Sequence, residues 1–138
     1  MHVRRRLFRV QTVKAPRRFP ESVALAIHES QVLGVRAGMK PHRVIGIWVV
    51  VVSGRVFVRS WSLKPRSWWR TFLEDPRGIM TVGSRRFSVR AVQRRGVLLN
   101  KAVSRAYLEK YDTPGALKYA RDLGGAKSRA TTTELVPR

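Results

Sequence analysis

The chain has 138 residues, of which 43% are hydrophobic, and a formal net charge of +21 at pH 7. This size and composition predict one compact domain with a core of its own. The absence of cysteine excludes disulfides, thiolate metal sites, iron–sulfur clusters and a cysteine nucleophile, and it suits the cytoplasmic location that we expect. The longest apolar run has nine residues, too few for a membrane-spanning helix, so no membrane partner is expected.

The first 20 residues contain seven basic residues and no acidic one. They predict a basic N-terminal arm, and residues 21–138 then form the folded domain. An ordinary solvated terminus, an extra edge strand and an arm that touches nucleic acid all remain open for this segment.

The first half of the domain predicts a helix followed by three strands. Residues 20–29 place apolar side chains at helical spacing, and residues 31–36 alternate as a strand does. Residues 44–52 are almost all apolar and β-branched, which is typical of a strand covered on both faces. A turn at Ser53-Gly54 leads into the alternating run 55–61, whose Val56, Val58 and Ser60 we expect to face the core.

The second half predicts three further strands and three helices. Ser67 is an expected N-cap for a short helix that ends at Asp75-Pro76. A hairpin over 79–92 turns at Gly83-Ser84, a helix over 101–111 begins at Asn100, and another begins at Thr113-Pro114. Residues 129–136 alternate as a last strand, although the terminal Leu-Val-Pro-Arg also matches a thrombin cleavage sequence. The expected fold class is therefore α+β and mostly β, with a six-stranded barrel and short helices.

Charge is unevenly distributed along the predicted barrel. Between Ser30 and Phe72 there are eight basic residues and no acidic one. Crowded cations repel one another, so an anionic ligand would neutralise them, and His42 beside Arg43 could reach such an anion. The alternative is a basic face that is simply solvated.

The run RSWSLKPRSWWRTFLEDPRGIMTVGSRRFSVRAV, from Arg59 to Val92, resembles the central signature of the split β-barrel flavin and deazaflavin superfamily, which is FMN-binding and pyridoxamine-phosphate-oxidase-like. Arg43, followed by Trp48 and the apolar strand, is similar to a motif of an uncharacterised branch of that superfamily. The resemblance implies a six-stranded split β-barrel, usually a homodimer, that binds FMN or a deazaflavin at the subunit interface.

Carried over by position, the resemblance implies a set of cofactor-binding residues. Basic and hydroxyl side chains would hold the phosphate, Trp68 would pack against the ring, and Arg43 and Trp48 complete the set. The phosphate-side candidates are Arg59, Ser60, Lys64, Ser67 and Arg70. Trp48 is also expected to be a buried structural anchor, and Tyr111 and Tyr119 lie either near the cofactor or in ordinary packing.

Catalytic side chains are scarce. The eight carboxylates are scattered, no Ser-His-Asp set can be assembled, and no histidine has another ligand at metal-binding spacing. A flavin-type enzyme needs few such groups because the cofactor carries the redox chemistry. We therefore expect an oxidoreductase of unknown substrate, with a basic β-barrel that binds nucleic acid through Trp61, Trp68 and Trp69 as the alternative.

Overall fold

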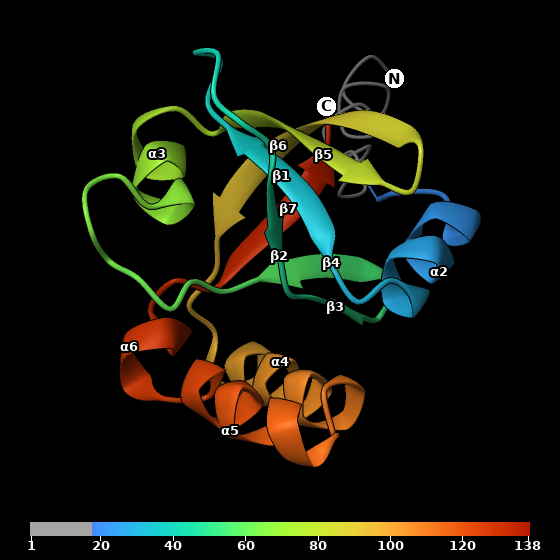
Figure 1. The fold of residues 1–138 in the computed structure, drawn as a ribbon, viewed down its shortest axis with the longest axis vertical. Helices are drawn as coiled ribbons and strands as arrows, with labels where there is room; N and C mark the ends of the chain where they lie inside the picture. Colours follow the sequence, from blue (N-terminus) through green and yellow to red (C-terminus); the bar gives the residue numbers. More distant parts are fainter. Residues whose placement is uncertain (1–17) are drawn as a thin grey trace, which may run out of the picture.

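The structure is a computed structural model that describes residues 18–138, so the predicted basic arm lies, over residues 1–17, outside the described residues. It is an α+β fold built on a curved antiparallel sheet (Figure 1). The strands are β1 (Leu33–Ala37), β2 (Ile45–Ile47), β3 (Val49–Val52), β4 (Arg55–Val58), β5 (Arg77–Val82), β6 (Arg85–Gln93) and β7 (Thr133–Pro137), and their order in the sheet is β2-β1-β5-β6-β7-β4-β3.

The sheet has seven strands where six are predicted, because the apolar run 44–52 is divided at Trp48. The segment before Trp48, β2, pairs with β1, and the segment after it, β3, pairs with β4. The two ends of the sheet are therefore consecutive pieces of one chain segment. This continuity makes the sheet a nearly closed barrel, as predicted.

The described residues form five helices around the barrel: α2 (Glu21–Glu29), α3 (Trp68–Glu74), α4 (Val97–Lys110), α5 (Pro114–Leu123) and α6 (Ala126–Arg129). The Ser67 and Thr113 N-caps are confirmed, since each hydroxyl accepts a hydrogen bond from a first-turn N–H. Helices contribute more residues than strands, and the predicted α+β class with a barrel-like sheet and short helices is confirmed.

Three boundaries differ clearly from the prediction. Strand β4 ends at Val58, whereas the predicted strand continues to residue 61. Helix α4 begins at Val97 with Gly96 as N-cap, whereas Asn100 was the expected cap. Strand β7 begins only at Thr133, because the preceding residues form α6. Leu135 is 1% exposed and pairs with Val56 and Ala91, so the Leu-Val-Pro segment belongs to the barrel.

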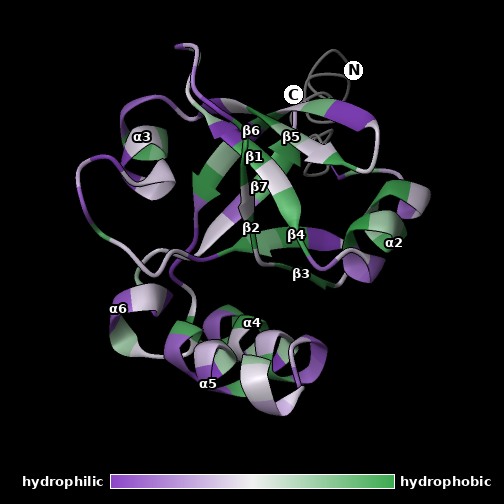
Figure 2. Ribbon diagram, in the orientation of Figure 1, coloured by the Kyte–Doolittle hydropathy of each residue, from purple (hydrophilic) through white to green (hydrophobic). Residues whose placement is uncertain are grey.

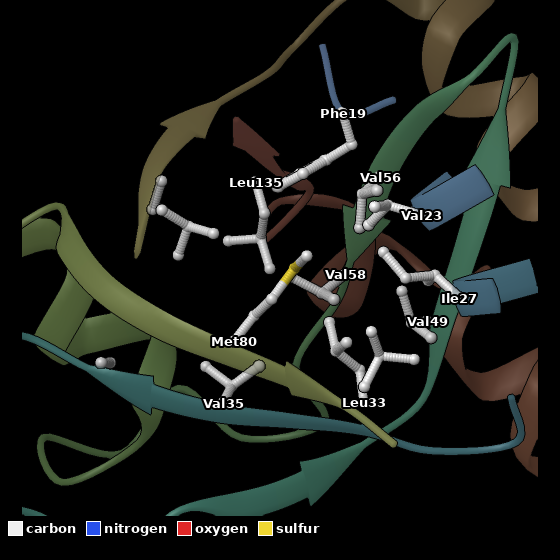
Figure 3. Close-up of a cluster of buried hydrophobic side chains, with 14 of the residues drawn as sticks. Phe19, Val23, Ile27, Leu33, Val35, Val49, Val56, Val58, Met80 and Leu135 are labelled. Carbon is white, nitrogen blue, oxygen red and sulfur yellow. The ribbon is translucent and has the colours of Figure 1, made fainter. Parts of the chain in front are cut away.

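The main core fills the barrel. Side chains of α2, among them Val23 and Ile27, close one end of it against β3 and β4 (Figure 3). Phe19, which precedes α2, packs in the same core and meets the Phe87 ring edge-on. Each fully buried aliphatic side chain here stabilises the fold by about 1.5–3 kcal/mol.

A second core lies outside the barrel, under α4 and α5. Phe57 and Val50 pack there against Tyr107, Tyr111 and Leu123. The two helices carry both hydrophobic and hydrophilic residues, as expected for helices that cover a sheet (Figure 2). Strand β4 is therefore covered on both faces: Val56 and Val58 do face the barrel, but Phe57 is buried as well.

Candidate functional site

The described residues form a cleft between the β1–β2 connection and α3. Its volume is about 720 Å³, within the range typical of small-molecule sites. The β1 side chains Val35 and Ala37 contribute to its apolar part. The other lining residues are Gly38, Met39, Lys40, Pro41, His42, Arg43, Ile45, Pro65, Arg66, Trp68, Thr71, Glu74 and Asp75.

Gly38 brings the two walls of the cleft together. Its φ of +75° is a left-handed conformation that favours glycine, and its N–H donates to Arg77 O at 2.7 Å. A Cβ at this position would lie 3.2 Å from the Thr71 methyl group on α3. The chain can therefore leave β1 directly against the helix and carry the basic residues that follow to the cleft.

Helix α3 is anchored at both ends. Ser67 caps its N-terminus by accepting the Arg70 N–H at 3.3 Å, and Phe72 is buried in the barrel core. Trp68 packs edge-on against Phe72, with 6.0 Å between ring centroids, and remains half-buried on the cleft side. Packing against Phe72 therefore fixes the orientation of the Trp68 indole without a ligand.

One side of the cleft is cationic. The β1–β2 connection supplies Lys40, His42 and Arg43, and the turn before α3 supplies Arg66; all four side chains are exposed. The cleft also has two carboxylates, Glu74 and Asp75, at the end of α3.

Asp75 forms an ion pair with Arg77, which is not one of the cations that line the cleft. The Arg77 guanidinium donates to both Asp75 oxygens, at 3.0 and 3.1 Å, and these hydrogen bonds lower the pKa of the carboxyl group to about 2. Arg77 therefore neutralises the Asp75 charge at the edge of the cleft. Lys40, Arg43 and Arg66 make no ion pair with a described carboxylate, which leaves these three cations available to an anion.

Of the eight residues predicted from sequence, two line the cleft: Arg43 and Trp68. Ser67 adjoins it as the cap of α3. Lys64 and Arg70 are exposed on the turn and helix next to it, and Arg70 Nε donates to Leu63 O at 3.0 Å. Five of the predicted residues are thus gathered in or beside one site.

Arg59 lies elsewhere and is 2% exposed. Its guanidinium donates to Thr132 Oγ1 at 2.8 Å, Ser104 Oγ at 2.7 Å, Leu123 O at 2.9 Å and Asn100 O at 3.0 Å. Burial lowers its pKa to about 10, so it remains charged at neutral pH. Its donors are all directed at protein oxygens, so in this structure it joins α4, α5 and β7 and does not face the cleft.

Ser60 and Trp48 also lie outside the cleft. Ser60 is 3% exposed; its N–H donates to Thr131 Oγ1 and its hydroxyl to Ser62 O, which shapes the chain after β4. Trp48 is half-buried and stacks in parallel on Tyr111, with 3.9 Å between ring centroids. It packs against the second core, and its ring also meets the edge of Trp61 at 5.3 Å.

Sequence reasoning did not single out Lys40 or Arg66. The usable signal was the turn Lys40-Pro41-His42-Arg43, which joins two strands and therefore had to lie at one end of the barrel. Among residues 18–138 there is no group of three His, Cys, Asp or Glu side chains that could hold a metal ion. The cleft therefore offers binding groups, namely cations, an indole and apolar side chains.

Fold and cleft together define an α+β protein with a nearly closed antiparallel barrel and a cationic cleft at one end. The sequence matches, over residues 24–135, the family described as uncharacterized protein conserved in bacteria (DUF2255). The chain belongs to this family.

The fold is similar to the crystal structure of the conserved hypothetical protein Rv2991 from Mycobacterium tuberculosis. The TM-score is 0.59 at 15% identity, and the alignment covers 91% of this chain and 84% of the other. At this identity the likeness concerns the fold alone. No curated protein matches the chain, and none of the helices in residues 18–138 is long and apolar enough to cross a membrane.

Proposed function

We propose that the cleft binds FMN or a deazaflavin cofactor and that the protein is an oxidoreductase that uses it. The observation that carries this proposal is the pairing of a fixed indole, Trp68, with three exposed cations, Lys40, Arg43 and Arg66, in one cleft of about 720 Å³. A flavin-type cofactor has the same two parts, a flat aromatic ring and an anionic phosphate. The resemblance of residues 59–92 to the split β-barrel superfamily supports the same cofactor class.

The donor set fits such a cofactor. Arg43 and Arg66 present planar guanidinium groups, which match phosphate oxygens in pairs, and Lys40 adds a point charge. Trp68 and the edge of α3 would cover the ring and exclude water from it. When bound, the cofactor supplies hydride transfer, and the chain supplies binding, orientation and desolvation.

The phosphate contacts can be tested by titration with FMN and with riboflavin, which lacks the phosphate, followed by flavin fluorescence. Arg43→Gln and Arg66→Gln should each weaken FMN binding by about ten- to a hundredfold, the value of one charge-assisted hydrogen bond. Riboflavin affinity should hardly change. A phosphorylated deazaflavin and its dephosphorylated form make the same comparison by absorbance.

Arg90→Gln is the matched control, since this exposed arginine lies on β6 and does not line the cleft. Equal losses in all three variants would show that only the net charge matters. Failure of the wild-type protein to take up any flavin or deazaflavin would remove the proposal.

A homodimer is part of this proposal. The β1–β2 hairpin exposes apolar side chains to solvent, with Val44 at 53%, Val32 at 49% and Ile45 at 38%. A second copy could cover them. Light scattering at micromolar concentration and moderate salt should give twice the 15.8 kDa of the chain, and a monomer mass would contradict the dimer.

Nucleic-acid binding is the second candidate function. A net charge of +21 is more than one cofactor phosphate neutralises. Among the three tryptophans considered for base stacking, Trp61 suits this function best. Trp68 and Trp69 are half-buried, and Trp69 Nε1 donates to Gln93 Oε1 at 2.8 Å, whereas Trp61 is 40% exposed.

A further inference from the structure

Three segments that are far apart in the sequence contain no Asp or Glu: residues 59–73, 94–108 and 123–133. Each carries several cations. The structure brings the three together where β7 begins, on the side of the molecule formed by α3, α6 and the start of α4 (Figure 1).

Hydrogen bonds join the three segments directly. The Ser60 N–H donates to Thr131 Oγ1 at 2.8 Å, and the Arg94 N–H donates to Thr132 O at 3.0 Å. The Arg59 guanidinium, which belongs to the first segment, contacts the second through Asn100 and the third through Leu123 and Thr132. The exposed cations next to these contacts define one surface, here named the basic face and composed of Arg95, Lys101, Lys127 and Arg129.

Two of these residues can be placed more closely. Lys101 lies three residues before Ser104 on α4, so it neighbours the helix surface that meets Arg59. Arg129 lies near enough to Arg59 that its charge adds to the effect of burial in lowering the Arg59 pKa. The buried Arg59 charge thus reinforces the positive potential at the surface.

Carboxylates do little to neutralise this surface. Glu134, which follows the third segment, is 2% exposed and is held by Arg55 at 2.7 Å and Arg94 at 2.9 Å. The described residues 18–138 contain three ion pairs, and the four cations of the basic face take part in none of them. Such a surface is complementary to a polyanion.

Trp61 adds an aromatic group at the edge of the basic face. Its ring is 40% exposed and is supported from behind by Trp48 and Tyr119, whose ring centroids lie 5.3 and 6.3 Å away. A supported, exposed indole can stack on a base only if that base is unpaired. The aromatic group therefore favours a single strand over a duplex.

We propose that the basic face binds single-stranded nucleic acid, with phosphates on its cations and a base on Trp61. This inference rests on the second candidate function and names its surface. It does not involve the cofactor cleft, whose Arg43 and Arg66 are not part of the basic face.

The test is fluorescence anisotropy of a labelled oligothymidylate, and of a duplex, over a range of salt. Each phosphate contact on a single strand contributes about 0.7 to the slope of log K against log salt. Arg95→Gln/Arg129→Gln should therefore lower the magnitude of the slope by about 1.4. Trp61→Ala should weaken single-strand binding about tenfold, Trp61→Phe less, and duplex binding should hardly change.

The matched control is Arg86→Gln/Arg90→Gln, which removes two exposed arginines from β6. It should leave the slope unchanged. Equal effects of both double variants would overturn the basic face as the surface while leaving nucleic-acid binding in place. No binding by the wild-type protein near about 150 mM salt would overturn the second candidate function itself. Thermal unfolding confirms that each variant is folded.

Discussion

Tyr111, the C-cap residue of α4, provides for Val49 the hydrogen bond that a neighbouring strand would otherwise provide. Its hydroxyl accepts the Val49 N–H at 3.1 Å and donates to Gln31 O at 2.8 Å. Tyr107, one turn earlier, accepts the Arg59 N–H at 3.0 Å beyond the end of β4. The two tyrosines thus satisfy backbone groups at positions where the strand ladder stops.

Tyr111→Phe removes one hydroxyl and leaves the Val49 N–H and the Gln31 carbonyl without this partner. We expect the free energy of unfolding to fall by about 1–3 kcal/mol, the cost of unsatisfied buried polar groups. Urea unfolding measures this loss. Tyr119→Phe is the control, because Tyr119 is 49% exposed and should change stability by less than about 0.5 kcal/mol. Equal effects would show that the Tyr111 hydroxyl has no special role.

Arg59→Ala should destabilise the protein by at least about 3 kcal/mol. It leaves several buried oxygens unpaired, and each costs about 1–3 kcal/mol. Arg59→Lys should not restore stability, since a single ammonium cannot reproduce the planar fork of donors. Arg86→Ala, at an exposed position, is the control. A folded Arg59→Ala variant of wild-type stability would mean that these hydrogen bonds contribute little.

Glu134→Gln should lower the free energy of unfolding by about 1.5–3 kcal/mol at pH 7, through loss of charged hydrogen bonds to Arg55 and Arg94. Burial alone would raise the pKa of this carboxyl group, but the two arginines outweigh it and hold the pKa below the ordinary value of 4.5. Stability from Glu134 is therefore present above about pH 4.5 and is lost as the pH falls through the folded pKa.

The difference between wild type and Glu134→Gln should accordingly shrink on acidification. Urea unfolding at a series of pH values from 7 to 3 measures it. Glu74→Gln, at an exposed position, should show no comparable change. A difference that stays constant across this range would contradict the ion-pair account.

Lys110 should make the free energy of unfolding increase with pH in the alkaline range. Its Nζ donates to Val49 O at 2.8 Å and Ile27 O at 3.2 Å, and burial lowers its pKa from 10.5 to about 8. Between these two values the unfolded chain binds more protons than the folded one, so the free energy of unfolding increases with pH. Relative to Lys110→Met, the wild type should gain stability from about pH 8 to pH 10.5.

The exposed Lys101 provides the control for this titration, since Lys101→Met should show no such slope relative to wild type. Taking the difference between two variants cancels other groups that titrate in the same range. A flat difference between wild type and Lys110→Met would mean that the Lys110 ammonium is as well solvated in the folded state as in the unfolded state.

Local chemistry allowed the turns and caps to be predicted from sequence. Ser53-Gly54 adopts positive φ at both positions and Gly83 at one, as tight hairpins require. Ser67 and Thr113 were recognisable because a hydroxyl before a helical pattern has few other roles. The start of α4 was missed, because Val97 and Leu98 are 70% and 82% exposed and their apolar character suggested an apolar link instead.

Long-range pairing could not be predicted in the same way. Nothing in the run 44–52 marks Trp48 as the residue where the strand changes partners, since that depends on closure of the whole barrel. Arg59 was placed with a phosphate by the family resemblance, whereas its actual partners lie 41 to 73 positions away in the chain. Arg43 and Trp68, which do line the cleft, came from the family resemblance.

The position of β7 has a consequence for how the chain can fold during synthesis. This strand follows all the others in the sequence, yet it lies between β6 and β4. The β5–β6 and β3–β4 hairpins can form as soon as they leave the ribosome, but each keeps an unpaired edge until residues 133–137 have been made. Unpaired edges recruit strands from other chains, so the nascent chain is exposed to misassembly until the residues of β7 are synthesised.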